Sequence, residues 1–197
     1  MNDARDLPSM LARVAVVGAS CAGKTTFARE LATLLSAPCT ELDELYWQKD
    51  WRPREMEEFR RLVQEAVSRE CWVADGNYGI VRDLVWSQAT SVVWLDYSFR
   101  LTFGRALIRT VRRCIRREEL FSGNRESFRK SFLSRDSILL WVVSSFRGRR
   151  RELTEIIQSD QFPGIRFYRF ETPEDAEVFL SQIRAGAAVG LAEAQAS

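Results

Sequence analysis

Short apolar runs alternate with amphipathic segments along most of the chain. The apolar runs are rich in β-branched residues and end at turn-forming residues, which is typical of buried strands: residues 13–17, 40–42, 71–74, 91–95 and 165–170. Apolar positions three and four apart between these runs predict helices over residues 24–35, 53–70, 99–117, 135–158 and 173–184, with Pro53 at the start of the second. Because the strands are apolar throughout and separated by helices, the pattern predicts an α/β fold with a five-stranded parallel sheet covered on both faces.

The length of 197 residues suits a single domain spanning residues 1–197. We expect residues 186–197, which are small and weakly patterned, to form a disordered tail. The longest apolar run, residues 138–143, is too short for a membrane-spanning helix, so no membrane association is expected. The four cysteines are widely spaced, which favours free thiols in a reducing, cytoplasmic setting.

The chain contains no histidine. This excludes Ser-His-Asp and Cys-His catalysis, histidine-ligated zinc and a histidine general base. A carboxylate must therefore supply any general base.

Positive charge is concentrated in one region. Residues 100–151 carry 15 basic and four acidic side chains, a net charge of +11, although the whole chain has a net charge of +2. Such a concentration indicates an anionic partner, either a phosphate-bearing ligand or nucleic acid. A solvated helix face is the alternative interpretation.

The segment from Gly18 to Thr25 matches the phosphate-binding pattern G-x-x-x-x-G-K-[ST], between a predicted strand and a predicted helix. Glycines let the backbone wrap a phosphate chain, and the helix N-terminus adds partial positive charge. Lys24 is placed to reach the β- and γ-phosphates, and the Thr25 hydroxyl to ligate Mg²⁺. We expect ATP and Mg²⁺ to be bound by the loop and the residue after it: Gly18, Ala19, Ser20, Cys21, Ala22, Gly23, Lys24, Thr25 and Thr26.

Three aspartates follow predicted strands, namely Asp43, Asp75 and Asp96. A carboxylate at the carboxyl end of a strand beside the loop is the expected partner of the metal. Each of the three is also an ordinary strand-ending turn residue. The order of the strands, which the sequence does not reveal, decides among them.

Aromatic residues follow two of these acids: Tyr46, Trp47 and Trp51 after Asp43, and Tyr78 after Asp75. They are suited to stack on the ring of an acceptor molecule. Capping of the core is the equally weighted alternative.

The phosphate loop, Leu42-Asp43 and Asp75-Gly76 together resemble the adenylate-kinase-like branch of P-loop kinases. The segments Leu42–Trp47 and Trp72–Tyr78, followed by Trp141 and Phe146-Arg147, are more closely similar to bacterial DNA topology modulation (FlaR-type) proteins. The resemblance spans about residues 12–182 in order. It implies a three-layer α/β/α P-loop NTPase fold with an arginine-rich helical lid over about residues 110–150.

The resemblance also implies roles for individual residues. Asp75 matches the aspartate that holds Mg²⁺ through water, and Asp43 matches an acid that contacts metal or the acceptor hydroxyl. Arg105 and Arg109 are similar to lid-helix arginines that stack on adenine and touch phosphate. Arginines after the lid, which neutralise the transferred phosphoryl group, match Arg147 and residues 149–151, while Thr172 matches a residue beside adenine. The implied catalytic set is Lys24, Asp43, Arg109 and Arg147.

One departure from adenylate kinases concerns the acceptor. Asp75-Gly76 continues as Asn77-Tyr78, where those enzymes have Phe/Tyr-Pro-Arg, and Arg82 is the nearest arginine. The acceptor site is therefore not an AMP site of the usual kind. We expect the acceptor to be bordered by Asp43, Tyr46, Trp47, Asn77 and Tyr78.

These observations favour a kinase that transfers the γ-phosphoryl group of Mg²⁺–ATP to an unidentified small-molecule acceptor, such as a nucleotide, a nucleoside or another hydroxylated compound. The alternatives are a nucleotide-controlled DNA-binding regulator, which the basic region favours, and an ATPase switch without an acceptor. The absence of a helix-turn-helix or an interleaved aromatic-basic motif makes nucleic acid the less favoured partner.

Overall fold

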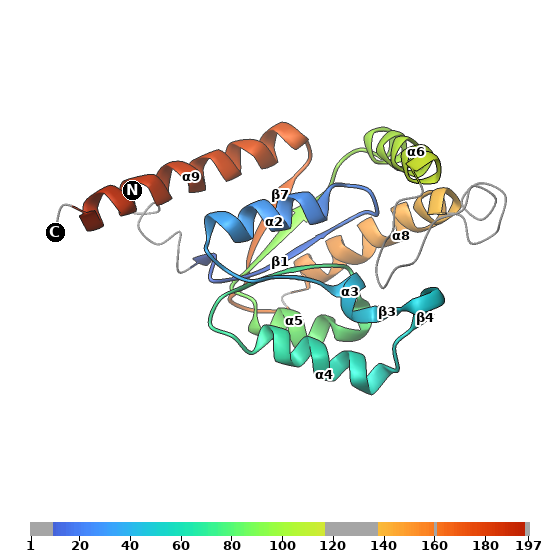
Figure 1. Ribbon diagram of the computed structural model, residues 1–197, viewed down its shortest axis with the longest axis horizontal. Coiled ribbons are helices and arrows are strands. Elements are labelled where there is room, and N and C mark those ends of the chain that lie inside the picture. The colour runs from blue at the N-terminus through green and yellow to red at the C-terminus, as the bar shows by residue number, and fades with distance from the viewer. Residues whose placement is uncertain (1–9, 117–137, 160, 196–197) are drawn as a thin grey trace.

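Five parallel strands form the central sheet of the computed structural model, which describes residues 10–116, 138–159 and 161–195 (Figure 1). The strands are β1 (Arg13–Gly18), β2 (Cys39–Glu41), β5 (Trp72–Asp75), β6 (Ser91–Leu95) and β7 (Arg166–Phe170). Their order across the sheet is β2-β5-β1-β6-β7, and every pairing is parallel. The five predicted strands and their parallel arrangement are confirmed. β1 is central, so the residues that follow β5 and β6 lie on either side of the phosphate loop.

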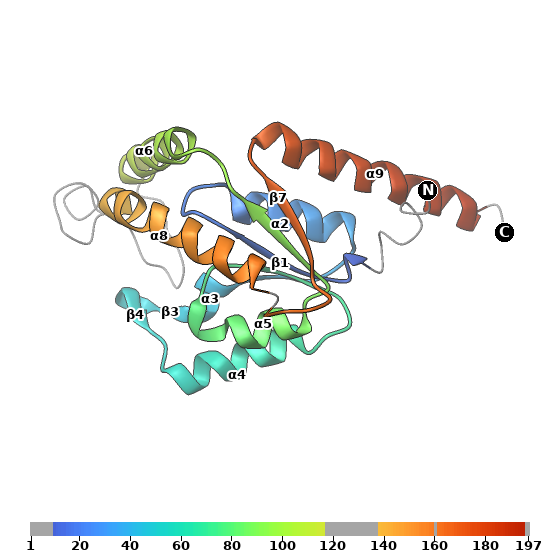
Figure 2. The same ribbon diagram turned by 180° about the vertical axis from the view of Figure 1, so that it is seen from behind.

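Helices cover both faces of the sheet (Figures 1 and 2). One face is covered by α2 (Lys24–Leu34) and α9 (Pro173–Gln195), and the other by α4 (Met56–Val67), α5 (Arg82–Gln88) and α8 (Ile138–Gln158). At the end of the sheet where the strands terminate, α6 (Phe99–Arg116) packs against α8. Shorter elements complete the chain: α3 (Leu42–Tyr46), β3 (Trp47–Gln48), η1 (Lys49–Trp51), β4 (Arg52–Pro53) and η2 (Gly79–Val81).

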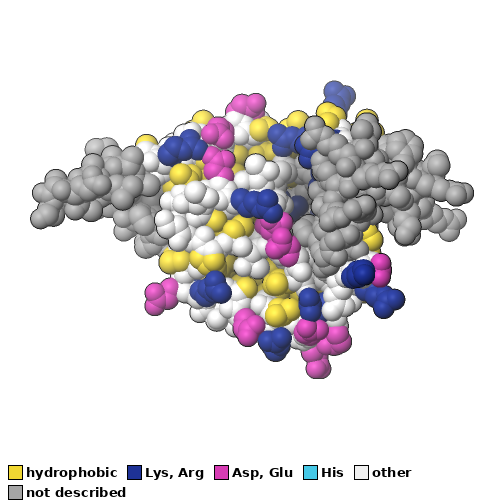
Figure 3. Space-filling view, in the orientation of Figure 1, with side chains coloured by type: hydrophobic (Ala, Val, Ile, Leu, Met, Phe, Trp, Pro, Cys, Tyr) yellow, Lys and Arg dark blue, Asp and Glu magenta, His cyan; other side chains and the backbone are white. Residues whose placement is uncertain are grey.

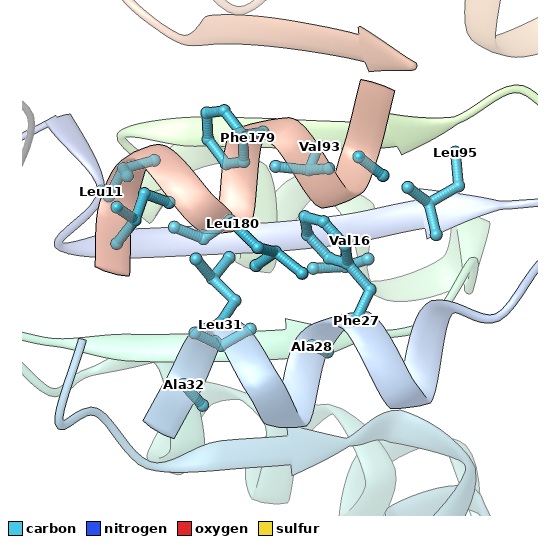
Figure 4. Close-up of a cluster of buried hydrophobic side chains, with 14 of the residues drawn as sticks. Leu11, Val16, Phe27, Ala28, Leu31, Ala32, Val93, Leu95, Phe179 and Leu180 are labelled. Atoms are coloured by element: carbon cyan, nitrogen blue, oxygen red, sulfur yellow. The ribbon is translucent and has the colours of Figure 1, made fainter. Parts of the chain in front are cut away.

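The core consists of two layers separated by the sheet. Val14 and Val16 of β1 face α2 and α9, where Phe27, Leu31 and Phe179 pack (Figure 4). Alternate residues of the same strand, Ala15 and Val17, face the opposite cluster, which includes Phe59, Trp72, Trp86 and Leu153. Successive side chains of a strand point to opposite faces, so a strand buried on both faces must be apolar at every position. This is why the predicted strand at residues 13–17 was recognisable.

Several segments differ from the sequence prediction. α5 was not predicted, and it buries only Val85 and Trp86. Pro53, expected to begin a helix, lies in β4 opposite Trp47, and α4 begins three residues later, where the Glu55 side chain accepts a hydrogen bond from the Glu58 amide. Proline lacks an N–H group and is tolerated in edge strands as well as in a first helical turn, so its position alone does not decide.

The C-terminal helix is longer than predicted. α9 continues to Gln195, where we expected a disordered tail from residue 186, and the alanine-rich composition of this stretch favours helix. Residues 117–137 of the expected lid lie outside the described part of the chain. Among the helices of the described segments, none combines the length and apolar character needed to cross a membrane.

Candidate active site

The phosphate loop connects β1 to α2 at the carboxyl end of the sheet. A Cβ atom on Gly18 would lie 2.5 Å from the backbone oxygen of Leu95, so the close approach of β1 and β6 requires glycine there. Gly23, with a φ of 101°, precedes α2, whose first turn carries the Lys24 and Thr25 side chains. The ammonium group of Lys24 donates a hydrogen bond to the Ala19 carbonyl oxygen at 3.1 Å. This contact holds the lysine across the mouth of the loop.

Asp75 lies at the end of β5, directly beside the start of α2. The Thr25 hydroxyl donates to Asp75 Oδ2 at 2.5 Å. Asp75 is 6% exposed, and within the described residues its other oxygen, Oδ1, is buried without a hydrogen-bond partner. Burial raises the pKa of this carboxyl, while Lys24 and the Thr25 hydroxyl lower it and Asp43 raises it further. The loop and β5 therefore bring together a hydroxyl and a carboxylate with one free, buried oxygen.

Asp43 lies in the first turn of α3, after β2. The Tyr78 hydroxyl donates to Asp43 Oδ1 at 2.5 Å. Burial, together with the charge of Asp43 and the hydrogen bond to it, raises the pKa of Tyr78 well above its usual value. The Tyr78 hydroxyl consequently stays protonated and donates its hydrogen bond to the Asp43 carboxylate.

The aromatic residues around Asp43 pack on one another. The Tyr46 ring lies 4.8 Å from the Tyr78 ring and 5.1 Å from that of Phe59, which is fully buried. Trp47 contacts Tyr46 at 4.9 Å and Trp51 at 5.8 Å, across the β3–β4 hairpin. Tyr46 and Tyr78 are thus bound to the core on one side, while they stay half-buried beside Asp43 on the other. The two interpretations of these aromatic residues, that they cap the core and that they border an acceptor, are therefore compatible.

The structure separates Asp96 from the other two aspartates. Its carboxylate, 4% exposed as a side chain, accepts hydrogen bonds from Arg150 of α8 at 3.1 Å and from Arg169 of β7 at 2.6 Å. Both guanidinium groups bind the same oxygen, Oδ2. Asp96 therefore ties α8 and β7 to the end of β6. This pairing with two arginines accounts for a buried carboxylate at this position without a role in metal binding.

Asn77, expected at the acceptor, has its side-chain amide on the phosphate loop instead. Its Oδ1 accepts a hydrogen bond from the Gly18 amide at 3.1 Å, and its Nδ2 donates to the Gly18 carbonyl oxygen. The Asn77 carbonyl oxygen in turn accepts a hydrogen bond from Arg149 at 3.1 Å.

The expected lid arginines occupy different surroundings. Arg105 of α6 donates to the Ala22 carbonyl oxygen at 2.7 Å and lies over the Tyr97 ring at 5.4 Å, so it already contacts the phosphate loop. Arg109 is one helical turn further along α6 and half-buried. Arg147 is exposed, in an open depression along α8 with Arg150 and Arg151. Of the arginines expected to follow a lid, Arg149 donates to the Asn77 carbonyl oxygen and Arg150 to Asp96.

Two of the remaining expected nucleotide contacts, Thr26 and Thr172, lie at the surface. Thr26 is exposed in the first turn of α2, and Thr172 is exposed and accepts a hydrogen bond from the Asp175 amide, which caps α9. Cys21, within the loop, has a φ of 68° and lies 3.9 Å from the Ser20 hydroxyl. The contacts of these residues with a nucleotide stay predictions.

A small cavity of about 20 Å³ lies between Tyr78 and α8. Polar groups from both sides line it, including Arg82 and Glu152, which form an ion pair at 2.7 Å. Arg82, the nearest arginine to the motif that follows Asp75, is thus paired with α8.

Comparison with known proteins identifies the fold. No family model matches the sequence, and no curated protein matches it. A shikimate kinase from Bacteroides thetaiotaomicron superposes with a TM-score of 0.54 at 16% identity, covering 88% of this chain and 97% of that one. A shikimate kinase from Acinetobacter baumannii in complex with shikimate gives 0.52 at 19% identity, covering 98% and 97%. A gluconokinase from Sinorhizobium meliloti gives 0.51 at 18% identity, covering 94% and 96%.

The chain therefore has the α/β/α fold of P-loop small-molecule kinases, as expected from the phosphate-binding pattern. At these identities the likeness concerns the fold. The finer resemblance to DNA topology modulation proteins stays a prediction.

Sequence reasoning missed the roles of Arg149 and Tyr78 in this arrangement. Arg149 was one of four arginines near residue 150, and no local signal distinguishes it from Arg147. Tyr78 was recognised as an aromatic ring, whereas its contact with Asp43 depends on the adjacency of β2 and β5.

Proposed function

We propose that the protein is an ATP-dependent kinase that transfers the γ-phosphoryl group of Mg²⁺–ATP to a hydroxyl group of a small molecule. The observation that carries the proposal is the placement of Asp75 against Thr25, at the end of a complete phosphate loop. Asp43 lies in the first turn of α3, directly after β2, the strand that pairs with β5, and an acceptor hydroxyl would approach there. The shared fold with small-molecule kinases supports this assignment.

The residues present fit a magnesium ion. Mg²⁺ in kinases is held by one or two protein oxygens, with water and substrate phosphates completing the shell. Asp75 Oδ1, which has no hydrogen-bond partner among the described residues, and the Thr25 hydroxyl supply such oxygens. Bound there with ATP, the ion would offset the negative charge of the β- and γ-phosphates.

Lys24 and the loop amides would bind the phosphate chain. Lys24 donates to the Ala19 carbonyl oxygen, and a phosphate oxygen would be a stronger, charged acceptor for the same ammonium group. The N-terminus of α2 adds its partial positive charge at the same place. Arg105, and on lid closure Arg109 and Arg147, would add positive charge around the transferred group.

Asp43 would orient the acceptor. The acceptor hydroxyl oxygen attacks the γ-phosphorus, the bond to the β-phosphate oxygen breaks, ADP leaves, and the hydroxyl proton passes to the Asp43 carboxylate. The hydrogen bond from Tyr78 leaves Asp43 Oδ2 available to the hydroxyl. Tyr46 and Trp47 would form the adjoining wall.

The class of acceptor follows from the same surroundings. The neighbours in fold are named for gluconate and shikimate, and one of them is complexed with shikimate. We therefore expect a hydroxylated small molecule, with nucleosides and nucleotides as the next group to try. The ion pair of Arg82 with Glu152 is consistent with an acceptor site unlike that for AMP.

The test is ADP formation from Mg²⁺–ATP in the presence of hydroxylated acids, sugars, nucleosides and nucleotides. Lys24→Ala removes the phosphate-binding ammonium group and serves as the blank. Arg69→Ala, at an exposed position after α4, is the matched control for loss of a cation. Stimulation by one acceptor, present in the control and lost in Lys24→Ala, is the expected result.

Other outcomes would redirect the assignment. Slow ADP release that no acceptor accelerates, yet lost in Lys24→Ala, would indicate an ATPase switch. Absence of turnover would contradict the kinase proposal and favour the DNA-binding alternative, for which steeply salt-dependent binding is the signature. That alternative has little support in the described residues, because Arg105, Arg149 and Arg150 contact groups of the protein itself. On the face shown in Figure 3, basic and acidic side chains are interspersed.

A further inference from the structure

The backbone pairing between β1 and β5 ends before the phosphate loop begins. The last registered pair is Val16 with Asp75, and the Gly76 amide donates to the Val16 carbonyl oxygen at 3.2 Å. In a parallel ladder, residues two apart on a strand present their N–H and C=O groups to the same neighbour. Gly18 therefore faces β5 as Val16 does, at a point where the β5 strand has already ended.

The side chain of Asn77 takes the place of the missing strand. A primary amide carries a donor and an acceptor, as a peptide group does. Asn77 Oδ1 accepts from the Gly18 amide at 3.1 Å, and Nδ2 donates to the Gly18 carbonyl oxygen. The ladder is thereby extended by one residue, and both backbone groups of a buried glycine are satisfied.

Gly18 is held on its other side by close packing. It pairs with Leu95 of β6, and the space that a Cβ atom would need is filled by the Leu95 backbone. Asn77 and β6 thus hold the first residue of the phosphate loop from both sides. The direction in which the following amides point depends on this residue.

Asn77 is itself held by α8. Arg149 of α8 donates to the Asn77 carbonyl oxygen at 3.1 Å. α8 is also tied to the sheet by the ion pair of Arg150 with Asp96. A continuous chain of contacts therefore runs from α8 through Asn77 to Gly18.

We propose that Asn77 is a positioning residue that fixes the geometry of the phosphate loop through Gly18, and that Arg149 makes this geometry depend on the placement of α8. The inference rests on the proposed function, since it assigns the loop a bound nucleotide. It differs from the sequence-based expectation, in which Asn77 borders the acceptor.

The first experiment examines the hydrogen bond without nucleotide. Labelling with ¹³C-carbonyl valine and ¹⁵N-glycine selects the glycines that follow valine, which are Gly18 and Gly190. Asn77→Asp keeps the acceptor and the size but removes the donor to the Gly18 carbonyl oxygen, and Asn77→Ala removes both. We expect one of the two signals to shift and its amide proton to exchange at least tenfold faster in Asn77→Ala, with the other signal unchanged. Unchanged exchange of both signals would overturn the proposal.

The second experiment measures nucleotide affinity with N-methylanthraniloyl-ADP and Mg²⁺. We expect Asn77→Asp to weaken binding by about tenfold, the size of one lost buried hydrogen bond, and to lower the thermal midpoint by no more than roughly 2–4 °C for each kcal/mol lost. Ser87→Ala, at an exposed position of α5, is the control and should bind as the wild type does. If Asn77→Asp binds the nucleotide as tightly as the wild type, the positioning role of Asn77 is overturned, while the proposed function stands. Failure of the wild type to bind would overturn the proposed function, and the glycine spectrum would still decide whether the contact with Gly18 exists.

The link to α8 is tested by a double-mutant cycle. If Arg149 acts through Asn77, the losses of nucleotide affinity in Arg149→Ala and Asn77→Asp will not add in the double variant. Full additivity of the two losses would overturn the part of the proposal that concerns Arg149.

Discussion

Asp75 and Asp96 lie at the carboxyl ends of the two strands that flank the central strand, and they have opposite surroundings. Asp75 is the last residue of β5 and Asp96 directly follows β6; both strands pair with β1, and each aspartate is 6% exposed. Asp96 accepts hydrogen bonds from two guanidinium groups, whereas Asp75 accepts one from Thr25 and keeps a buried oxygen without a partner in the described chain. The carboxyl ends of the two strands beside β1 therefore carry a structural ion cluster on one side and, among the described residues, an incompletely paired carboxylate on the other.

The neighbouring edge strands account for the difference. β7 pairs with β6 and supplies Arg169, which also lies over the Trp94 ring at 4.8 Å. β2 pairs with β5 and places Glu41 opposite Asp75. The strand beside Asp75 therefore contributes an acid at this level, whereas the strand beside Asp96 contributes an arginine. An incompletely paired buried carboxylate costs stability, and such sites are retained where a ligand completes them.

The largest expected effect is on catalysis, through Asp75→Asn. The variant keeps the size of the side chain and an acceptor for the Thr25 hydroxyl but loses the charge that would hold Mg²⁺. We expect turnover of Mg²⁺–ATP to fall at least about 100-fold, while the thermal midpoint in EDTA stays equal or rises. A variant that retains activity, or that unfolds at a much lower temperature, would contradict the distinction drawn between the two aspartates.

Asp96→Asn should have the opposite effect. Loss of the charge leaves Arg150 and Arg169 without their shared carboxylate, and because both are 45% exposed they can turn partly to solvent. We expect the free energy of unfolding to fall by about 2 kcal/mol, a shift of roughly 4–8 °C for a chain of this size. Turnover of the folded protein should remain within about threefold of the wild type. Asp83→Asn, which breaks the exposed pair with Arg60, is the control and should cost well under about 1 kcal/mol.

Asp43 is an intermediate case, since a neutral hydroxyl rather than a cation holds it. Tyr78→Phe removes that hydroxyl and keeps the ring that packs on Tyr46. We expect acceptor-dependent turnover to fall about tenfold, the effect of one lost hydrogen bond that orients a reacting group. ATP hydrolysis without acceptor should not change. Equal losses in both reactions would mean that Tyr78 acts on the nucleotide site instead.

The smallest expected effect is a pH dependence of stability. Because burial raises the pKa of Asp75 above its usual 3.8, the folded state binds a proton more readily than the unfolded state. Stability from this group is therefore present at low pH and decreases as pH rises from 3.8 through the higher pKa of the folded state. In EDTA, the stability of Asp75→Asn relative to the wild type should increase over that interval. A pH-independent difference between the two proteins would contradict the assignment.

The sheet and the phosphate loop were predictable because their signals are local. Strands buried on both faces are apolar at every position, and the loop pattern lies within eight residues. α5 was not predicted, because seven residues with two buried side chains give almost no periodic signal. Arg149 could not be distinguished from Arg147: residues two apart on a helix point about 200° apart, so the packing of α8 decides which one reaches Asn77.

The sequence by itself determined that this is an α/β protein with a phosphate loop and that three aspartates follow its strands. Only the tertiary structure decided that Asp75 lies beside Thr25, that Asp96 is neutralised by Arg150 and Arg169, and that Asn77 completes the ladder at Gly18. The physical reason is that strand order is a long-range property. The three central strands are recognisable from their own burial, whereas the partners of the side chains near their ends come from segments 50 to 73 residues away in the chain.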